Sequence, residues 1–219
     1  MEPYTKKLEG IIKQMLSPLK GLPFKLVIEG ISGYKVLAFD LEDAKNKELI
    51  ENLKTVAKSA CKEVNKNGIE RPRPNEVGND IEPFIKNALT TIGYKADTPK
   101  TKDGKKKSTG YPDIEFEDNY KRTNYLECKT FNIDNVNTTQ RSFYLSPSED
   151  FKVTRNAYHL AICFEIYVEG RKGINNVYKC KSWKLLNLEN LDIDVKYEFN
   201  SDNHRMYDSS LLLAEGNIN

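Results

Sequence analysis

The strongest constraint on the fold is a regular alternation of apolar and polar residues between positions 111 and 130. The alternation breaks at 118–123, a polar stretch typical of a turn, so the segment is predicted to be a β-hairpin. Side chains two residues apart share one face of a strand, which directs the apolar residues to the core. The opposite face would gather acids and a lysine: Asp113, Glu115 and Glu117 on the first strand, and Glu127 and Lys129 on the second. Such a face is suited to a metal ion and a phosphate.

The remaining chain carries both helical and strand periodicities. Apolar residues at helical spacing predict helices over 4–16, over 42–66 and over a segment that starts after the proline-rich 71–74 and ends at Gly93. Strands are predicted as a pair around a glycine turn in 24–41, at 158–168 and at 177–186, and residues 140–145 have an extended pattern. The mixture predicts an α/β (α+β) fold, with a central mixed β-sheet flanked by helices.

The helix that precedes the hairpin has an ambiguous start, because Pro83 lies near its beginning. Asp80 can cap a helix that holds Pro83 in its first turn, where proline is tolerated. The alternative is a start near Asn75 with a kink at Pro83. Both starts place an acid, Glu82 or Glu76, in the first half of this helix.

Charge and length suggest one compact domain in three parts. Residues 1–70 form a helix and strand segment, 71–186 form the core with the hairpin, and 187–219 form an acidic C-terminal segment. That last segment has seven acids and two basic residues, a balance of −5, which leaves +7 on the other residues of a chain of net charge +2. The asymmetry is compatible with an anionic partner, and equally with ordinary scatter of surface charge.

The four cysteines indicate a reducing environment. They are widely spaced, with no CxxC pair and no zinc-ligand spacing, so buried free thiols are expected. The chain shows no signal peptide and no apolar run long enough to span a membrane, so we expect a cytoplasmic protein without membrane contact.

A two-part motif on the hairpin resembles a known signature. Pro112-Asp113 is followed, after thirteen residues, by Glu127-Cys128-Lys129. This pattern resembles that of the PD-(D/E)XK nuclease superfamily, and within it most closely a type II restriction endonuclease. An acid-X-lysine triplet alone carries little weight, because four others start at Asp43, Asp103, Asp150 and Asp194. The resemblance covers roughly residues 75–168, and Asp150 falls in a stretch that looks like a loop.

The resemblance implies a role for each motif residue. Asp113, Glu127 and the backbone carbonyl of Cys128 would hold Mg²⁺, which prefers hard oxygen ligands. Lys129 would hold the attacking water and the scissile phosphate, and an acid from the preceding helix, Glu82 or else Glu76, would complete the site. Such a site hydrolyses phosphodiester bonds, because the metal offsets charge on the phosphate and activates water. The alternative is a surface hairpin held by weak cross-strand ion pairs.

Basic and polar residues beside the hairpin are candidates for DNA contact: Lys105, Lys106 and Lys107 in a lysine-rich loop, and Gln140 and Arg141 after the hairpin. Each has an ordinary alternative as a solvated surface residue. His159 lies in an apolar strand and is interpreted as a core histidine.

These features predict a Mg²⁺-dependent endonuclease that cleaves double-stranded DNA at a short specific sequence. Cleavage of both strands of a palindromic site would call for a homodimer. A structure-selective or repair nuclease of the same superfamily is one alternative, and a non-catalytic DNA-binding module is the other.

Overall fold

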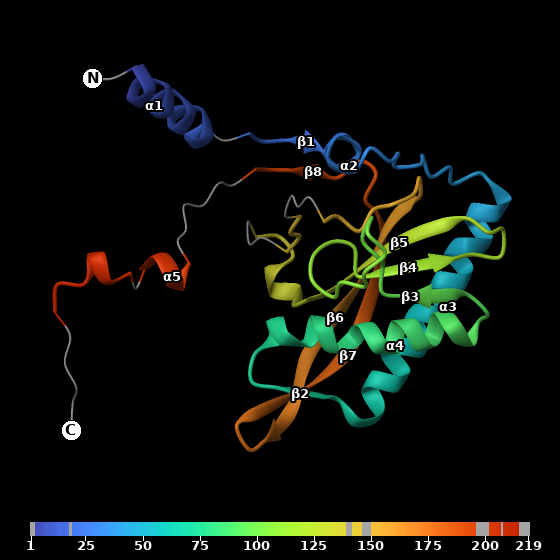
Figure 1. Cartoon of the computed structure of the whole chain (residues 1–219). Helices are drawn as coiled ribbons and strands as arrows, with labels where there is room; N and C mark the ends of the chain where they lie inside the picture. Colours follow the sequence, from blue (N-terminus) through green and yellow to red (C-terminus); the bar gives the residue numbers. More distant parts are fainter. Residues whose placement is uncertain are drawn as a thin grey trace. The chain divides into compact units, whose positions relative to one another are not determined.

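The computed structural model describes residues 3–17, 19–138, 142–145, 150–195, 202–206 and 208–214. The chain divides into two compact units, Pro23–Asp192 and a smaller unit made of the two chain ends, Met1–Leu22 with Ile193–Asn219 (Figure 1). The larger unit holds the hairpin, and each unit is described by itself.

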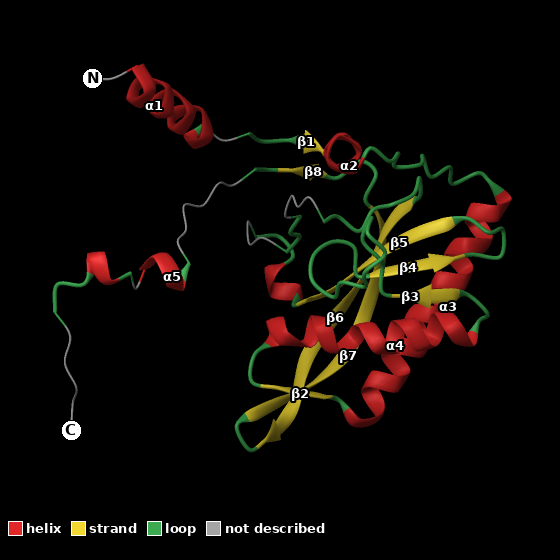
Figure 2. Ribbon diagram, viewed as in Figure 1, coloured by secondary structure: helices red, strands yellow, loops and turns green. Residues whose placement is uncertain are grey.

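A six-stranded mixed sheet forms the centre of the larger unit (Figure 2). Its strand order is β2-β7-β6-β5-β4-β3, in which only β5 and β6 are parallel neighbours. The strands are β2 (Ile69–Arg71), β3 (Lys95–Asp97), β4 (Ile114–Glu117), β5 (Thr123–Phe131), β6 (Tyr158–Lys172) and β7 (Asn175–Asn187). The predicted mixed sheet and the strands expected near 158–168 and 177–186 are confirmed, and β6 and β7 are longer than expected.

The predicted hairpin is formed by β4 and β5, with Ile114 paired to Leu126. Ile114, Phe116, Leu126 and Cys128 are all buried in the main hydrophobic cluster, as the alternation predicts. Asp118 closes the turn, because its carboxylate accepts hydrogen bonds from the backbone N–H and the guanidinium Nε of Arg122 at 3.0 and 2.7 Å.

Two helices, α3 (Ala44–Asn67) and α4 (Val77–Thr91), pack on one face of this sheet. Asp43 caps α3 by accepting a hydrogen bond from the backbone N–H of Lys45 at 2.7 Å. A short 3₁₀ turn, η1 (Pro74–Glu76), leads into α4, so Pro83 lies inside the helix. Of the two predicted starts, the one with Asp80 as N-cap is wrong, because the 3₁₀ turn and α4 begin ahead of Asp80. The alternative start near Asn75 fits the structure.

The two strands expected in 24–41 are wrong. Residues Phe24–Ser32 form helix α2, which ends at Gly33 in the left-handed region with φ 76°. Phe24 and Ile28 are 0% and 2% exposed, whereas Leu26 is 60% exposed, so the segment follows a spacing of four rather than two. The apparent second strand contributes only an isolated bridge from Val36 to Ala157.

A second hydrophobic cluster covers part of the other face of the sheet. It contains Phe24, Ile28, Val36, Tyr111, Tyr125, Val153, Ala157, Ala161 and Leu188. Phe24 and Ile28 come from α2, while Tyr125 and Ala161 come from the parallel neighbours β5 and β6. The hairpin therefore lies between two packed layers, and the segment that precedes β6 is tied to the sheet through Val153.

The smaller unit contains the predicted helix at the N-terminus, α1 (Pro3–Leu16), and short elements near the C-terminus, α5 (Asn203–Met206) and η3 (Ser209–Leu211). A separate two-stranded sheet pairs β1 (Leu22–Pro23) with β8 (Asp192–Ile193). No helix among the described residues is both long enough and apolar enough to cross a membrane.

Candidate active site

The structure brings the two halves of the motif together. Asp113 comes immediately before β4, and Glu127 and Lys129 lie on β5. One carboxylate oxygen of Asp113, Oδ2, accepts a hydrogen bond from the backbone N–H of Cys128 at 2.8 Å. This bond fixes the Asp113 carboxylate beside the strand segment that carries Glu127 and Lys129.

Glu127 is a buried acid with one oxygen engaged and one left open. Its side chain is 3% exposed, and Oε1 lies 2.6 Å from Nζ of Lys129. Oε2 is also buried and has no hydrogen-bond partner among the residues that the structure describes. Burial, followed by the charge of Asp113, raises the pKa of Glu127 to about 7. A cation placed at Oε2 would relieve both effects.

Lys129 is stabilised in its charged form by the acids around it. Burial alone would lower its pKa, but the charges of Glu127 and Asp113 outweigh that effect and raise the pKa above the ordinary value for lysine. Lys129 is therefore an ammonium group held beside two carboxylates.

Glu82 on α4 approaches the same group of charges. Its pKa is raised by burial and then by the charge of Asp113, while Lys86, Lys152 and Lys129 act in the opposite direction. The Lys86 ammonium lies 3.9 Å from one Glu82 carboxylate oxygen. Glu76, the other helical candidate, lies in η1, and its negative charge contributes to raising the pKa of Arg71. Of the two helical candidates, Glu82 is the one whose pKa is influenced by Asp113 and Lys129.

Lys152 was missed from the sequence. It precedes β6 in the chain and is 2% exposed. Burial lowers the pKa of Lys152, although the negative charges of Asp113, Glu127 and Glu82 act to raise it. A signal was present, because Lys152 ends the triplet Asp150-Phe151-Lys152. The triplet falls in a loop outside the hairpin, yet Lys152 lies close enough to Asp113, Glu127 and Glu82 for their charges to influence its pKa.

The lysine-rich loop is partly engaged in ion pairs. Lys106 pairs with Asp97 at 2.6 Å, and Lys107 lies 3.6 Å from a carboxylate oxygen of Asp150. Lys105 is exposed. The other two candidates for DNA contact, Gln140 and Arg141, lie outside the described residues.

The other two acids of the hairpin, Glu115 and Glu117, have partners outside the motif residues. Glu117 pairs with Lys121 at 3.2 Å. Glu115 faces a separate cavity of about 280 Å³ and is influenced by Arg155 and Lys100, with its pKa raised first by burial. Both acids are therefore best described as neighbours of the site.

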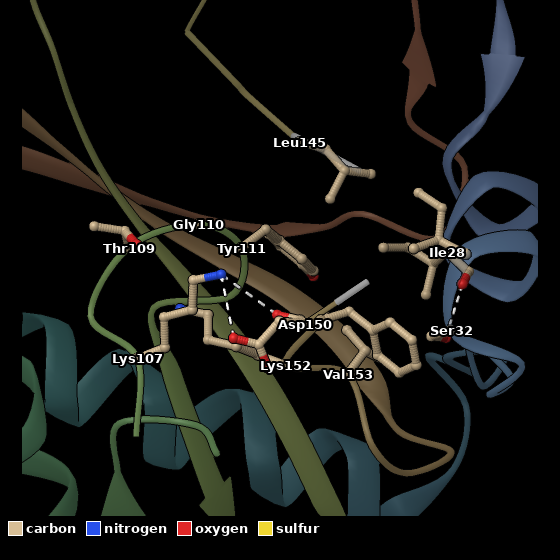
Figure 3. Close-up of a pocket in the computed structure, with 12 residues that line it drawn as sticks. Ile28, Ser32, Lys107, Thr109, Gly110, Tyr111, Leu145, Asp150, Lys152 and Val153 are labelled. Atoms are coloured by element: carbon tan, nitrogen blue, oxygen red, sulfur yellow. Dashed lines mark hydrogen bonds and ion pairs between the residues drawn. The ribbon is translucent and has the colours of Figure 1, made fainter. Parts of the chain in front are cut away.

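A cavity of about 360 Å³ opens beside Tyr111 and is lined in part by Lys107 and Lys152 (Figure 3). Tyr111 is held by His159, since the tyrosine hydroxyl and the imidazole Nδ1 are 2.7 Å apart. Burial lowers the pKa of His159 to about 3, so the ring is neutral and shares one hydrogen bond with the Tyr111 hydroxyl. The interpretation of His159 as a core histidine is confirmed by its 1% exposure.

Asp113 and Glu127 fit a divalent cation through the chemistry of their donors. They offer two carboxylates, one of them with a buried oxygen that lacks a partner. Among the described residues, no group of three or more His, Cys, Asp or Glu side chains is arranged to hold a metal ion. Two carboxylates suit Mg²⁺, which usually completes its shell with water and substrate phosphate.

Comparisons with known proteins agree on one family. A family model described as the type II restriction enzyme MjaV family matches residues 18–210. The type II restriction enzyme MjaV of Methanocaldococcus jannaschii is 38% identical over 230 aligned residues, which cover 98% of this chain and 97% of the relative. No solved structure gave a significant match.

Proposed function

Because this chain belongs to the type II restriction enzyme MjaV family, and is thus a site-specific deoxyribonuclease, we propose that it cleaves double-stranded DNA with Mg²⁺ at a PD-(D/E)XK site. The proposed site consists of Asp113, Glu127, Lys129 and Glu82. The observation that carries the proposal is the buried Glu127 carboxylate, which has Lys129 at 2.6 Å on one oxygen and no described partner on the other.

Each residue has a distinct part in the proposed reaction. Asp113 and Glu127, with the backbone carbonyl of Cys128, would hold Mg²⁺, which would supply charge neutralisation at the phosphate and a more acidic water. Lys129 donates hydrogen bonds to the attacking water and orients it for in-line attack. Glu82 adds negative charge from α4, where the Lys86 ammonium lies 3.9 Å from one of its carboxylate oxygens.

The proposed substrate is a short specific sequence in duplex DNA. Lys105, Lys106, Lys107, Gln140 and Arg141 are proposed to contact it, chiefly through phosphates for the lysines. Two copies of the chain related by a two-fold axis would place one site on each strand of a palindrome, so the proposed working form is a homodimer.

The test is digestion of mixed-sequence plasmid DNA with Mg²⁺ and, separately, with EDTA. Discrete bands that need Mg²⁺ are expected, and Asp113→Ala and Lys129→Ala should abolish them. Glu117→Gln is the matched control, because it removes a hairpin acid that is occupied by Lys121 and should leave cleavage intact.

The other outcomes discriminate among alternatives. Cleavage of branched DNA alone would indicate a structure-selective nuclease. Retardation of DNA without cleavage would indicate a binding module. Full cleavage by Asp113→Ala or Lys129→Ala would show that the assignment of the site is wrong.

A further inference from the structure

Lys152 is a buried cation that no described residue contacts by a hydrogen bond. Its side chain is 2% exposed and its Nζ lacks a partner. The neighbouring backbone is fixed, because Val153 belongs to the second hydrophobic cluster and the backbone N–H of Thr154 donates to the hydroxyl of Tyr125 at 2.9 Å. The ammonium is therefore held at depth by the fold.

Holding an ammonium group in this way is unfavourable. Burial of a charged group without hydrogen bonds is strongly destabilising. The negative charges of Asp113, Glu127 and Glu82 favour the charged form of Lys152 and offset part of this cost. None of these acids forms an ion pair with Lys152 within 4.0 Å. The three N–H donors of Lys152 are thus left for a ligand that brings its own acceptors.

A second cation faces the same cavity from a different segment. Lys107 of the lysine-rich loop lines the cavity of about 360 Å³ together with Lys152 and acts on it by repulsion. In Figure 3 the two lysines lie on one side of the cavity, and Ile28 and Ser32 of α2 lie on the other. Asp150 also lines this cavity and its carboxylate lies 3.6 Å from Lys107, whereas Lys152 has no described partner, so a bound anion would be held chiefly by Lys152 with Lys107 as the second positive charge.

The cavity also adjoins the proposed reaction centre. Its wall includes Gly110 and Tyr111, and only Pro112 separates Tyr111 from Asp113 in the chain. Lys129 is already engaged by Glu127 at 2.6 Å, whereas the donors of Lys152 are not engaged by any described residue. The two lysines are therefore suited to different tasks, one at the water and one at the phosphate.

We propose that the cavity beside Lys107 and Lys152 binds the scissile phosphate of the DNA, and that Lys152 is a second catalytic lysine that donates hydrogen bonds to a non-bridging oxygen of that phosphate. The proposal rests on the nuclease function proposed above. Lys152 stabilises the negative charge that builds up on these oxygens during attack, and Lys107 strengthens binding of the same phosphate from the rim of the cavity.

The test uses the full chain with Lys152→Gln and, as a second variant, Lys152→Met, which retains an unbranched side chain without charge. Lys172→Gln is the control, because this lysine is 73% exposed and pairs with Glu70 on the sheet edge formed by β2. The probe is a duplex that spans a cleavage position mapped from the plasmid digest. Binding is measured by fluorescence anisotropy over 50–200 mM salt with Ca²⁺ in place of Mg²⁺, and cleavage is measured as a single-turnover rate with Mg²⁺.

Three results together support the proposal. The slope of log affinity against log salt becomes shallower by about 0.9 in both variants, as expected for one lost phosphate contact. The cleavage rate falls about 100-fold, the usual effect of removing one donor to a transition-state oxygen. The melting temperature of Lys152→Met equals or exceeds that of the unmodified chain, because an unpaired buried charge has been removed.

Two results would overturn it. One is an unchanged salt slope and cleavage rate in folded variants. The other is a fall of more than about 5 °C in the melting temperature of both variants together with loss of cleavage, which would make Lys152 a structural residue. If the unmodified chain does not cleave DNA at all, the proposed function fails, while the salt slope on mixed-sequence duplex still tests the anion site.

Discussion

Replacing Glu127 with glutamine should stabilise the metal-free protein at alkaline pH while abolishing cleavage. The carboxylate is held in a buried position where its charge is unfavourable, and its pKa rises from the ordinary 4.5 to about 7 on folding. Each step of one in pKa corresponds to about 1.4 kcal/mol, so the charged carboxylate lowers the free energy of unfolding by about 3 kcal/mol at pH 8.5.

The direction of the pH dependence follows from proton binding. Between pH 4.5 and pH 7 the folded protein binds more protons at Glu127 than the unfolded chain does, so this contribution to stability is lost as pH rises through that window. At pH 5 the carboxyl is mostly protonated in the folded protein, and the remaining cost is about 1 kcal/mol. The advantage of Glu127→Gln should therefore shrink by about 2 kcal/mol between pH 8.5 and pH 5.

Urea unfolding in EDTA, followed by the fluorescence of Trp183, measures this difference directly. Trp183 is the single tryptophan of the chain and packs against the main hydrophobic cluster. Glu117→Gln serves as the control, since that acid is half-buried and paired with Lys121. A Glu127→Gln advantage that is absent, or the same at both pH values, would refute the reasoning.

His159, Gly68 and the lysine-rich loop each give an expected outcome that can be measured. His159→Gln should reduce the loss of folding stability on acidification. The pKa of the buried imidazole falls from 6.5 to about 3, so only the unfolded chain takes up a proton at this residue, and folding stability falls by about 2 kcal/mol by pH 5. Parallel urea stability curves for both proteins from pH 7 to pH 5 would contradict this. Gly68→Ala should destabilise by at least about 2 kcal/mol in urea unfolding, because φ is 73° and a Cβ would clash with Val177 Cγ1; unchanged stability would show that this approach relaxes easily. Lys105→Gln should make the salt dependence of DNA binding shallower by about 0.9, and Lys106→Gln by less, since Lys106 already pairs with Asp97 at 2.6 Å; equal effects in anisotropy titrations would show that this ion pair opens on DNA.

The fold was predictable where one periodicity had no competitor. Over 111–130 an alternation of two buries Ile114 and Phe116, and no helical spacing fits the same residues. In 24–41 both periods fit, because Phe24 and Ile28 are separated by four and Leu26 lies between them. In the structure Leu26 is 60% exposed, as the helical spacing requires. Which of the two spacings is adopted depends on what the apolar residues pack against, and those partners are distant in sequence.

One part of the candidate site was likewise predictable from the sequence and another part was not. A hairpin predicts that Asp113, Glu127 and Lys129 come together, since strand pairing relates positions by register alone. Lys152 reaches the group through a connection between parallel strands, and the path of such a connection depends on what it packs against. Its anchor is Val153 in the second hydrophobic cluster, which contains residues from α2, β5 and β6. The periodicity of the sequence does not predict the packing of Val153 in that cluster.

The parallel pairing of β5 with β6 has a consequence for how this protein folds. The β4–β5 hairpin closes over residues 118–122, whereas pairing β5 with β6 must close over 132–157. Loop closure entropy grows with the logarithm of length, to about 3 kcal/mol for the longer connection and about half that for the hairpin. The hairpin with Asp113 and Glu127 should therefore form early in refolding, and Lys152 should join it only when the sheet closes. Recovery of enzymatic activity will then lag behind recovery of the hairpin.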